Sequence, residues 1–354
     1  MTGVRARGED IRRFIVDAVE KHPADISKIT AQRFNISRQA VNKHLVKLTA
    51  DGCLKESGKT RNRTYKLAPL SAWERTYDIV PGLAEDVIWT NDIRGALGHL
   101  PDNVMNIWHH GFTEMFNNAI DHSGGTTIHV DMRKTAASAE MALFDDGVGI
   151  FRKIQAALGL LDERHAIFEL AKGKLTTDPK RHSGEGIFFT SRMFDEFQIL
   201  SGGVFFSHEH GSAEDWVHKR TNPTKGTAVF MLLHNHTSRT TKRIFDHYVD
   251  GDDFGFTKTV VPVKLAQYGN DKLISRSQAK RVLVRVELFT TVLFDFSEVD
   301  TIGQAFADEI FRVFANEHPK IMLLPLHANS AVKRMIERVK SGITVTEEPS
   351  SSIA

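Results

Sequence analysis

The chain has 354 residues, of which 41% are hydrophobic and 25% are charged, and its formal net charge is +2. This composition excludes a disordered chain, and the length allows two or three domains, each with its own core. The single cysteine, Cys53, excludes an internal disulfide framework and a multi-cysteine zinc site. No apolar run approaches the roughly 18 residues of a membrane span, and the N-terminus lacks the apolar stretch of a secretory signal. We therefore expect a cytoplasmic protein that makes no membrane contact.

The positive charge is concentrated at the N-terminus. Residues 1–68 hold 15 Lys and Arg against 7 Asp and Glu, a net charge of +8, so the rest of the chain carries −6. We expect the basic segment alone to meet a polyanion.

Three helices and a hairpin are predicted in residues 1–68. Apolar residues recur at helical spacing over 9–21, while Asp25 and Ser37 are suitable N-caps for two further helices. Residues 53–56 and 64–67 are typical of two strands around a basic turn. The order of these elements resembles a winged helix-turn-helix DNA-binding domain, with a protein-binding helical domain as the alternative.

The resemblance implies that the third helix enters the major groove of DNA while the basic turn neutralises phosphates. The side-chain types suit these roles, because Asn and Gln pair with adenine and Arg pairs with guanine. The side chains expected to contact DNA are Arg38, Gln39, Asn42 and Lys43 of the helix, and Lys59, Arg61 and Arg63 of the turn.

Prolines interrupt the pattern after this segment. Pro69 and the pair Pro81-Gly82 flank a stretch with little periodicity. We predict a linker near 68–75 and a single helix around 83–100.

A polar stripe marks the next predicted helix. Its apolar residues lie about one turn apart, and they are Val104, Trp108, Phe112, Met115 and Ala119. Glu114 and Asn118 are four residues apart and share a face, and Asp121 lies one turn further along the same side. A carboxylate and an amide so placed can hold a hydrated Mg²⁺ and aim a base at a water, whereas a solvated surface is the alternative reading.

Glycine motifs follow the predicted strands. A strand over 141–144 runs into Asp145-Asp146-Gly147-Val148-Gly149, which places a carboxylate acceptor beside backbone that a flat ligand can approach closely. Ser183-Gly184-Glu185-Gly186 opens a helical run, where exposed amides favour phosphate. A late strand over 225–233 is entered through a glycine and carries Thr227.

In this order and spacing the motifs resemble those of the GHKL ATPase superfamily over about 76–237. The N box of that family matches residues 114–121, the G1 box matches 145–149 and the G2 box matches 184–186. The resemblance implies a Bergerat fold, with helices on one face of a mixed sheet, that binds ATP with Mg²⁺. The nucleotide-binding residues that it implies are Asn118, Asp121, Asp145, Gly147, Gly149, Gly184, Gly186 and Thr227, with Asn118 as the Mg²⁺ ligand.

Further roles follow from the same resemblance. Asp145 would accept a hydrogen bond from the adenine amino group, and Glu114 would be the general base on water or on a substrate hydroxyl. Residues 151–182 would form a lid that brings basic side chains to the γ-phosphate, or they form a basic solvated loop. The basic side chains of this lid are Lys172, Lys174, Lys180 and Arg181. The short stretch before Val104 leaves no room for the phosphoacceptor hairpin of a sensor kinase.

Strands and helices alternate in residues 255–343, which favours an α/β layer domain. Residues 293–300 and the helix after them resemble a STAS domain of the anti-sigma-antagonist type. Phosphorylatable members carry a serine at the start of that helix, whereas residues 301–305 hold none and offer only Thr301. We therefore expect a STAS-like binding scaffold, followed by a disordered tail at 344–354.

The sequence thus predicts an α+β multidomain protein. Its domains are a winged helix-turn-helix at 1–68, a Bergerat-fold α/β sandwich ATPase domain at 76–240 and a STAS-like α/β domain at 255–343. The expected function is an ATP-binding and DNA-binding regulator, with DNA as one partner and a protein or a second copy as another. The alternatives are an anti-sigma-type serine/threonine kinase acting on a STAS domain, and an ATPase effector that uses DNA as a tether.

Overall fold

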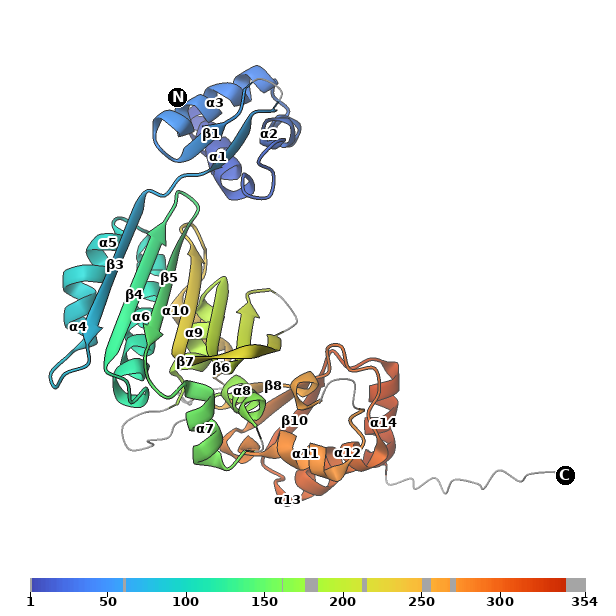
Figure 1. Cartoon of the computed structure of the whole chain (residues 1–354). Coiled ribbons are helices and arrows are strands. Elements are labelled where there is room, and N and C mark those ends of the chain that lie inside the picture. The colour runs from blue at the N-terminus through green and yellow to red at the C-terminus, as the bar shows by residue number, and fades with distance from the viewer. Residues whose placement is uncertain are drawn as a thin grey trace.

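The computed structural model describes residues 2–59, 62–160, 162–175, 184–211, 215–249, 256–267 and 272–341, without the side chains of 2–6 and 215–223. Three parts follow one another along the molecule (Figure 1): a small N-terminal head, a central five-stranded sheet with its helices, and a C-terminal α/β layer.

The head has the order of elements that the sequence predicts. Its elements are α1 (Thr2–Ala18), α2 (Ile26–Phe34), α3 (Arg38–Ala50), β1 (Leu54–Ser57) and β2 (Thr64–Leu67), and the two strands pair antiparallel. Ser37 caps α3, because its hydroxyl accepts from the backbone N–H of Ala40 at 3.2 Å. Asp25 makes no such bond to α2, since its carboxylate faces the ring of His22 at 3.1 Å instead.

The predicted linker near 68–75 is wrong. Strand β3 (Ser71–Asp78) occupies this segment and pairs antiparallel with β4 along its whole length. Trp73, Arg75 and Tyr77 share one face of the strand, but Arg75 is exposed, and this charged residue hides the alternation of buried and exposed positions. Arg75 is nevertheless held there, because it contacts Asp92 at 2.9 Å and lies over the Tyr77 ring.

The central sheet has the order β3-β4-β5-β7-β6, and every neighbouring pair is antiparallel. Its other strands are β4 (Thr127–Lys134), β5 (Ser138–Asp145), β6 (Glu196–Glu209) and β7 (Asp215–His234). The mixed sheet that the family resemblance implied is therefore wrong for the strands that the structure describes.

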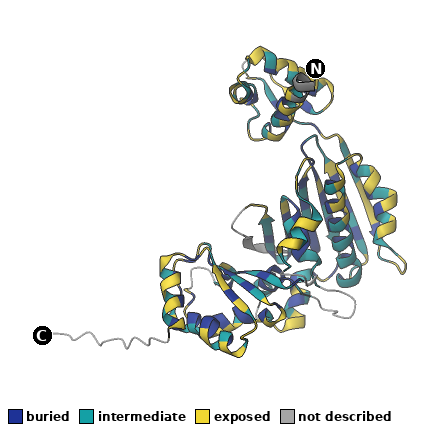
Figure 2. Cartoon of the chain, turned by 180° about the vertical axis from the view of Figure 1, so that it is seen from behind, coloured by how far each residue is buried: buried dark blue, intermediate teal, exposed yellow. Residues whose placement is uncertain are grey.

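Helices line one face of this sheet and close one end of it (Figures 1 and 2). The first is one continuous helix in three pieces, α4 (Glu85–Ile88), the π-helix η2 (Trp89–Ile93) and α5 (Arg94–Leu97). The others are α6 (Asp102–His122), α7 (Ile150–Leu158), α8 (Glu163–Lys172), α9 (Gly186–Met193) and α10 (Thr241–His247). Helix α6 buries the predicted apolar stripe, and α9 ends at Met193, where the chain turns into β6.

The C-terminal layer is a three-stranded parallel sheet in the order β10-β9-β8 with helices between the strands, as parallel pairing requires. Its strands are β8 (Lys258–Pro262), β9 (Thr291–Asp295) and β10 (Met322–Leu326). Its helices are η3 (Val263–Ala266), α11 (Arg276–Leu283), η4 (Val286–Leu288), α12 (Gln304–Asp308), η5 (Glu309–Phe314), α13 (Ala315–Glu317) and α14 (Ser330–Lys340).

The buried apolar side chains form two clusters. One belongs to the head and also takes in Ala137 from the turn between β4 and β5. The other is continuous from Tyr77 to Val339, so the central sheet and the C-terminal layer share one core. Figure 2 shows these buried residues concentrated where the helices meet the sheets.

Candidate functional site

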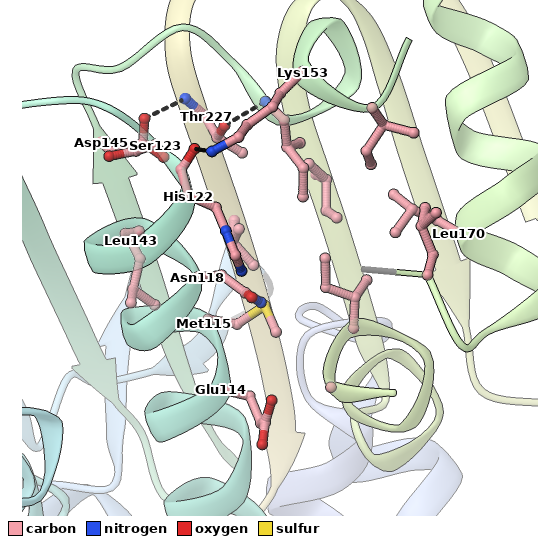
Figure 3. A pocket seen from close by; sticks show the side chains of 18 of the residues that line it. Glu114, Met115, Asn118, His122, Ser123, Leu143, Asp145, Lys153, Leu170 and Thr227 are labelled. Atoms are coloured by element: carbon pink, nitrogen blue, oxygen red, sulfur yellow. Dashed lines mark hydrogen bonds between the residues drawn. The ribbon is translucent and has the colours of Figure 1, made fainter. Parts of the chain in front are cut away.

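A pocket opens between α6, the ends of β5 and β7, and helices α7 and α9. Glu114, Asn118 and His122 occur every four residues on α6, and Figure 3 shows all three pointing from that helix toward the cavity. Among the described residues, the buried amide nitrogen of Asn118 has no hydrogen-bond partner. A buried polar atom without a partner costs free energy, so this amide marks a place where a ligand can supply the missing contact.

Asp145 lies at the opposite end of the pocket from Glu114 (Figure 3). Its Oδ1 accepts from the backbone N–H of Gly147 at 2.9 Å and of Thr227 at 3.2 Å, which fixes the carboxylate. Burial raises the pKa of Asp145, against the lowering effect of these two hydrogen bonds. Asp145 lines the pocket, where a fixed carboxylate can accept from an N–H donor.

The neighbouring Asp146 has a structural role. Its carboxylate accepts from the backbone N–H and the hydroxyl of Thr126, at 2.6 and 2.7 Å, and from the N–H of Thr127 at 3.0 Å. The hydrogen bonds from Thr126 and Thr127 hold the pKa of Asp146 far below its usual range. Asp145 therefore lines the pocket, whereas Asp146 holds the start of β4.

The cavity encloses about 280 Å³, which lies near the lower end of the range for small-molecule sites. Its walls are mainly apolar, with Leu143 and Ile199 on the sheet and Leu170 across from α6. Lys153 brings a cation to the Asp145 end, where its Nζ donates to the carbonyl oxygen of His122 at 2.7 Å. Thr227 accepts from the N–H of Ile150 at 3.0 Å and so ties α7 to β7.

Two glycines of the pocket lie where a side chain would collide with its neighbours. A Cβ at Gly186 would meet the Glu114 carboxylate, so the start of α9 and the stripe of α6 are in close contact. Gly184 has φ +75° and its carbonyl accepts from the N–H of Leu175 at 2.9 Å. This bond joins the residues on either side of 176–183, and that segment lies outside the described residues together with the predicted phosphate contacts Lys180 and Arg181.

Six of the predicted site residues line one cavity, namely Glu114, Asn118, Asp145, Gly184, Gly186 and Thr227. Asp121, Gly147 and Gly149 do not line it. A Cβ at Gly147 would collide with the backbone of Ser123, and a Cβ at Gly149, whose φ is +91°, would collide with the Ser201 side chain. Both glycines therefore serve packing. Sequence reasoning missed His122 and Lys153. The four-residue repeat from Glu114 pointed to His122, but no sequence signal distinguished Lys153.

The residues present fit a nucleotide with Mg²⁺. An amide oxygen at Asn118 can provide one ligand to an ion that keeps several waters, while the apolar walls and Asp145 suit a base with an amino group. The N-terminus of α9 lies at the Glu114 end, because Gly186 adjoins the Glu114 side chain, and phosphates would lie there. Within the described residues, no cluster of three His, Cys, Asp or Glu side chains could hold a metal by itself.

The residues predicted to contact DNA belong to α3 and the adjoining hairpin of the head. Arg38, Gln39, Asn42 and Lys43 of α3 and Lys59 of the turn are exposed, while Val41, Leu45 and Leu48 of α3 are buried. Arg63 is half-buried and contacts Glu56 at 2.9 Å, so part of its charge is already paired within the hairpin. Arg61 lies outside the described residues.

Comparison with known families identifies one part of the chain. Residues 278–333 match the model of a family described as a STAS-like domain of unknown function (DUF4325). The C-terminal layer is a STAS-like domain. No curated protein matches the chain. None of the helices in the described ranges is long and apolar enough to cross a membrane.

Helix α8 is fastened to the STAS-like domain by buried ionic groups. Lys172 is fully buried, and its Nζ donates to the Glu169 carboxylate at 2.8 Å and to the carbonyl oxygen of Val284 at 2.7 Å. Arg285 approaches Glu169 at 3.3 Å and donates to the carbonyl oxygens of Gly173 and Lys174. We call Glu169, Lys172 and Arg285 the α8 clamp.

The clamp overturns the expectation that Lys172 reaches a γ-phosphate. Burial lowers the pKa of Lys172 to about 8, and both of its contacts lead away from the pocket. Lys174 also points to the STAS-like domain, where its Nζ donates to the carbonyl oxygen of Leu288 at 3.0 Å and lies over the Phe289 ring. The segment predicted to be a lid is therefore partly a fixed connection between two domains.

Proposed function

We propose that this protein is a nucleotide-dependent regulator. ATP with Mg²⁺ binds in the pocket beside α6, and its binding changes how the STAS-like domain engages a protein partner and how the head engages DNA. The observation that carries the proposal is the buried amide nitrogen of Asn118, which has no hydrogen-bond partner among the described residues and lies in a cavity with a carboxylate at each end. The GHKL-like order of the motifs supports the same ligand.

The pocket divides into two ends that suit the two parts of a nucleotide. The Asp145 end offers a fixed acceptor between apolar walls, which favours a base with an exocyclic amino group. The Glu114 end offers Asn118 as a metal ligand and the N-terminus of α9 for phosphate oxygens. Glu114 is then placed to act as a general base on water next to the phosphates.

Helix α8 supplies the route from the pocket to the STAS-like domain. Leu170 lines the cavity, and the residues on either side of it along α8, Glu169 and Lys172, belong to the clamp. A ligand that displaces Leu170 therefore also displaces ionic groups that hold Arg285. Because the clamp is buried, these groups must move together or lose their partners.

A serine/threonine kinase acting on its own STAS-like domain is less well supported. The helix after β9 begins with Gly303 as its N-cap, and the residue available near it is Thr301, which is exposed. A regulatory switch requires no acceptor at this helix.

Asn118→Ala tests the proposal directly. We expect the affinity for ATP with Mg²⁺, measured by isothermal titration calorimetry, to fall by about tenfold or more, because the variant loses its metal ligand. Thermal stability should be retained, since the amide nitrogen of Asn118 makes no hydrogen bond within the described residues. Asn117→Ala, on the same helix but outside the cavity, is the matched control. Unchanged affinity in Asn118→Ala, or no nucleotide binding by the wild-type protein, would refute the proposal.

A further inference from the structure

Three chemically active side chains meet at the carboxyl edge of the STAS-like sheet. Asp295 is the last residue of β9, Ser297 follows two residues later, and His327 comes directly after β10. Leu326 pairs with Asp295 in the parallel register, so the two strands end side by side. The carboxyl edge of a parallel sheet is the edge at which α/β proteins bind their ligands.

The three side chains contact one another directly. Asp295 Oδ1 accepts from the backbone N–H of Ser297 at 2.9 Å and from its hydroxyl at 2.8 Å. The same oxygen lies 3.0 Å from Nδ1 of His327, and this nitrogen lies 3.1 Å from the Ser297 hydroxyl. Asp295 is largely buried, with 14% of its side chain exposed, whereas 58% of the His327 side chain is exposed.

These contacts determine the state of the histidine ring. An ionised carboxylate only accepts hydrogen bonds, so Nδ1 of His327 carries the proton that faces Asp295. The lone pair of the neutral ring is then on Nε2, which has no partner within the described residues. A carboxylate that orients a histidine in this way fixes the tautomer and the direction of the ring, so Nε2 is held facing away from Asp295.

The same geometry excludes Ser297 as the nucleophile. In a Ser-His-Asp triad the serine and the aspartate face different ring nitrogens, whereas here both face Nδ1. Ser297 therefore holds Asp295 in place, and the reactive atom of the cluster is Nε2 of His327.

The surroundings of His327 suit an incoming anion. The N-terminus of α14 follows two residues later, where Asn329 caps the helix and also donates to the carbonyl oxygens of Val299 and Asp300. Lys264 reaches the same loop, with its Nζ at 3.5 Å from the carbonyl oxygen of Glu298. Glu298 and His327 both have positive φ, 58° and 50°, and such backbone is kept at sites where the surrounding contacts hold it.

We propose that His327 is a phosphoryl acceptor. The lone pair of Nε2 forms a bond to phosphorus as the bond from phosphorus to the leaving group breaks, and the leaving group departs with its electron pair. The Nδ1 proton stays shared with Asp295, whose negative charge stabilises the positive charge that develops on the ring. When the donor is a nucleoside triphosphate, the leaving group is the nucleoside diphosphate. This choice of donor rests on the proposed function, whereas the assignment of His327 as the acceptor does not.

A small donor tests the acceptor without the nucleotide pocket. The full-length protein is incubated with phosphoramidate, which transfers its phosphoryl group to histidine and releases ammonia, and each site is quantified by mass spectrometry. We expect His327 to be modified at least about tenfold faster than His99, which is exposed and has no side-chain hydrogen bond in the described ranges, and Asp295→Asn to remove this advantage. Equal rates at the two histidines would overturn the proposal.

The second arm uses γ-labelled ATP with Mg²⁺ and the same protein. We expect label that is lost in acid and kept in alkali, present in His99→Ala and absent in His327→Ala. If ATP binds but neither ATP nor phosphoramidate modifies His327 in preference to His99, the proposal is wrong while the proposed function stands. If ATP does not bind but phosphoramidate still prefers His327, the proposed function is wrong and the acceptor stands.

Discussion

The polar residues of the pocket differ in how many hydrogen bonds they already make within the protein. Asp145 is fixed by two backbone donors, whereas the amide nitrogen of Asn118 has no partner in the described part of the chain. The first arrangement holds an acceptor in place before a ligand arrives, and the second leaves a contact for the ligand to make. The same reasoning separates Asp146, which is saturated by Thr126 and Thr127, from its neighbour.

We expect Glu114→Gln to retain nucleotide binding and to slow hydrolysis by about 10²- to 10⁴-fold, because an amide cannot accept the proton of the attacking water. The substitution keeps the size of the side chain next to Gly186, where there is little room. Phosphate release under single-turnover conditions measures the effect, and calorimetric binding of ATP is the control. Full hydrolysis by the variant would show that Glu114 is not the base.

The buried Lys172 makes the free energy of unfolding depend on pH in the alkaline range. Burial lowers its pKa from 10.5 to about 8, so between these values the unfolded chain binds more protons than the folded protein. The free energy of unfolding should therefore rise with pH between about 8 and 10.5 in the wild-type protein, relative to Lys172→Met. Urea unfolding across this range measures the difference, and parallel curves for the two proteins would contradict the prediction.

Helix α8 is held in place by contacts with distant parts of the chain. Its sequence suggested part of a basic lid, yet seven of its residues, Ala166–Lys172, are buried between the pocket and the STAS-like domain. The hydroxyl of Thr259 on β8 donates to the carbonyl oxygen of Lys172 at 2.6 Å and adds a contact to the end of the helix. The element is thus held by the domain that follows it in the chain.

Arg285→Ala should destabilise the protein by about 3 kcal/mol, because it leaves Glu169 with one partner fewer and removes a donor from the carbonyl oxygens of Gly173 and Lys174. The matched control is Arg276→Ala, whose side chain is 62% exposed and pairs with Asp308 at 3.4 Å, and it should cost less than about 1 kcal/mol. Chemical denaturation of both variants measures the contrast. Equal losses would mean that the clamp does not hold the two domains together.

The whole molecule connects the head to the body through a small contact. Only Ala68, Pro69 and Leu70 lie between β2 and β3, and the turn between β4 and β5 places Ala137 in the core of the head. Asn235 supports this turn, since its amide donates to the carbonyl oxygens of Thr135 and Ala136 at 3.0 and 3.2 Å. The basic helix α3 is therefore presented at one end of the molecule, with the STAS-like domain at the other (Figure 1).

If the head binds DNA, Lys43→Ala combined with Lys59→Ala should reduce the slope of log affinity against log salt by about 2, one unit for each phosphate contact. Fluorescence anisotropy with duplex DNA at several salt concentrations measures this slope. Lys242→Ala is the control for loss of a lysine elsewhere, because this exposed lysine on α10 pairs with Asp246 and lies outside the head. An unchanged slope in the double variant would place any DNA contact elsewhere.

Much of this arrangement was predictable from the sequence because it depends on local patterns. Period and capping residues predicted the order of elements in the head, the long helix α6 and the strand–helix alternation of the STAS-like domain. Spacing alone placed Glu114 and Asn118 on one helical face, and the end of a strand placed Asp145 beside its glycines.

The tertiary structure decided everything that depends on contacts between distant segments. The sequence predicts a linker where β3 lies, because this strand is stabilised by pairing with β4 and by the Arg75–Asp92 contact, and neither leaves a local pattern. The sequence also predicts a phosphate contact for Lys172, because a buried lysine and a solvated one look alike until Val284, 112 residues away, is in place. The net charge of +2 likewise describes no single surface, because folding separates the basic head from the body and buries charges such as those of the α8 clamp within it.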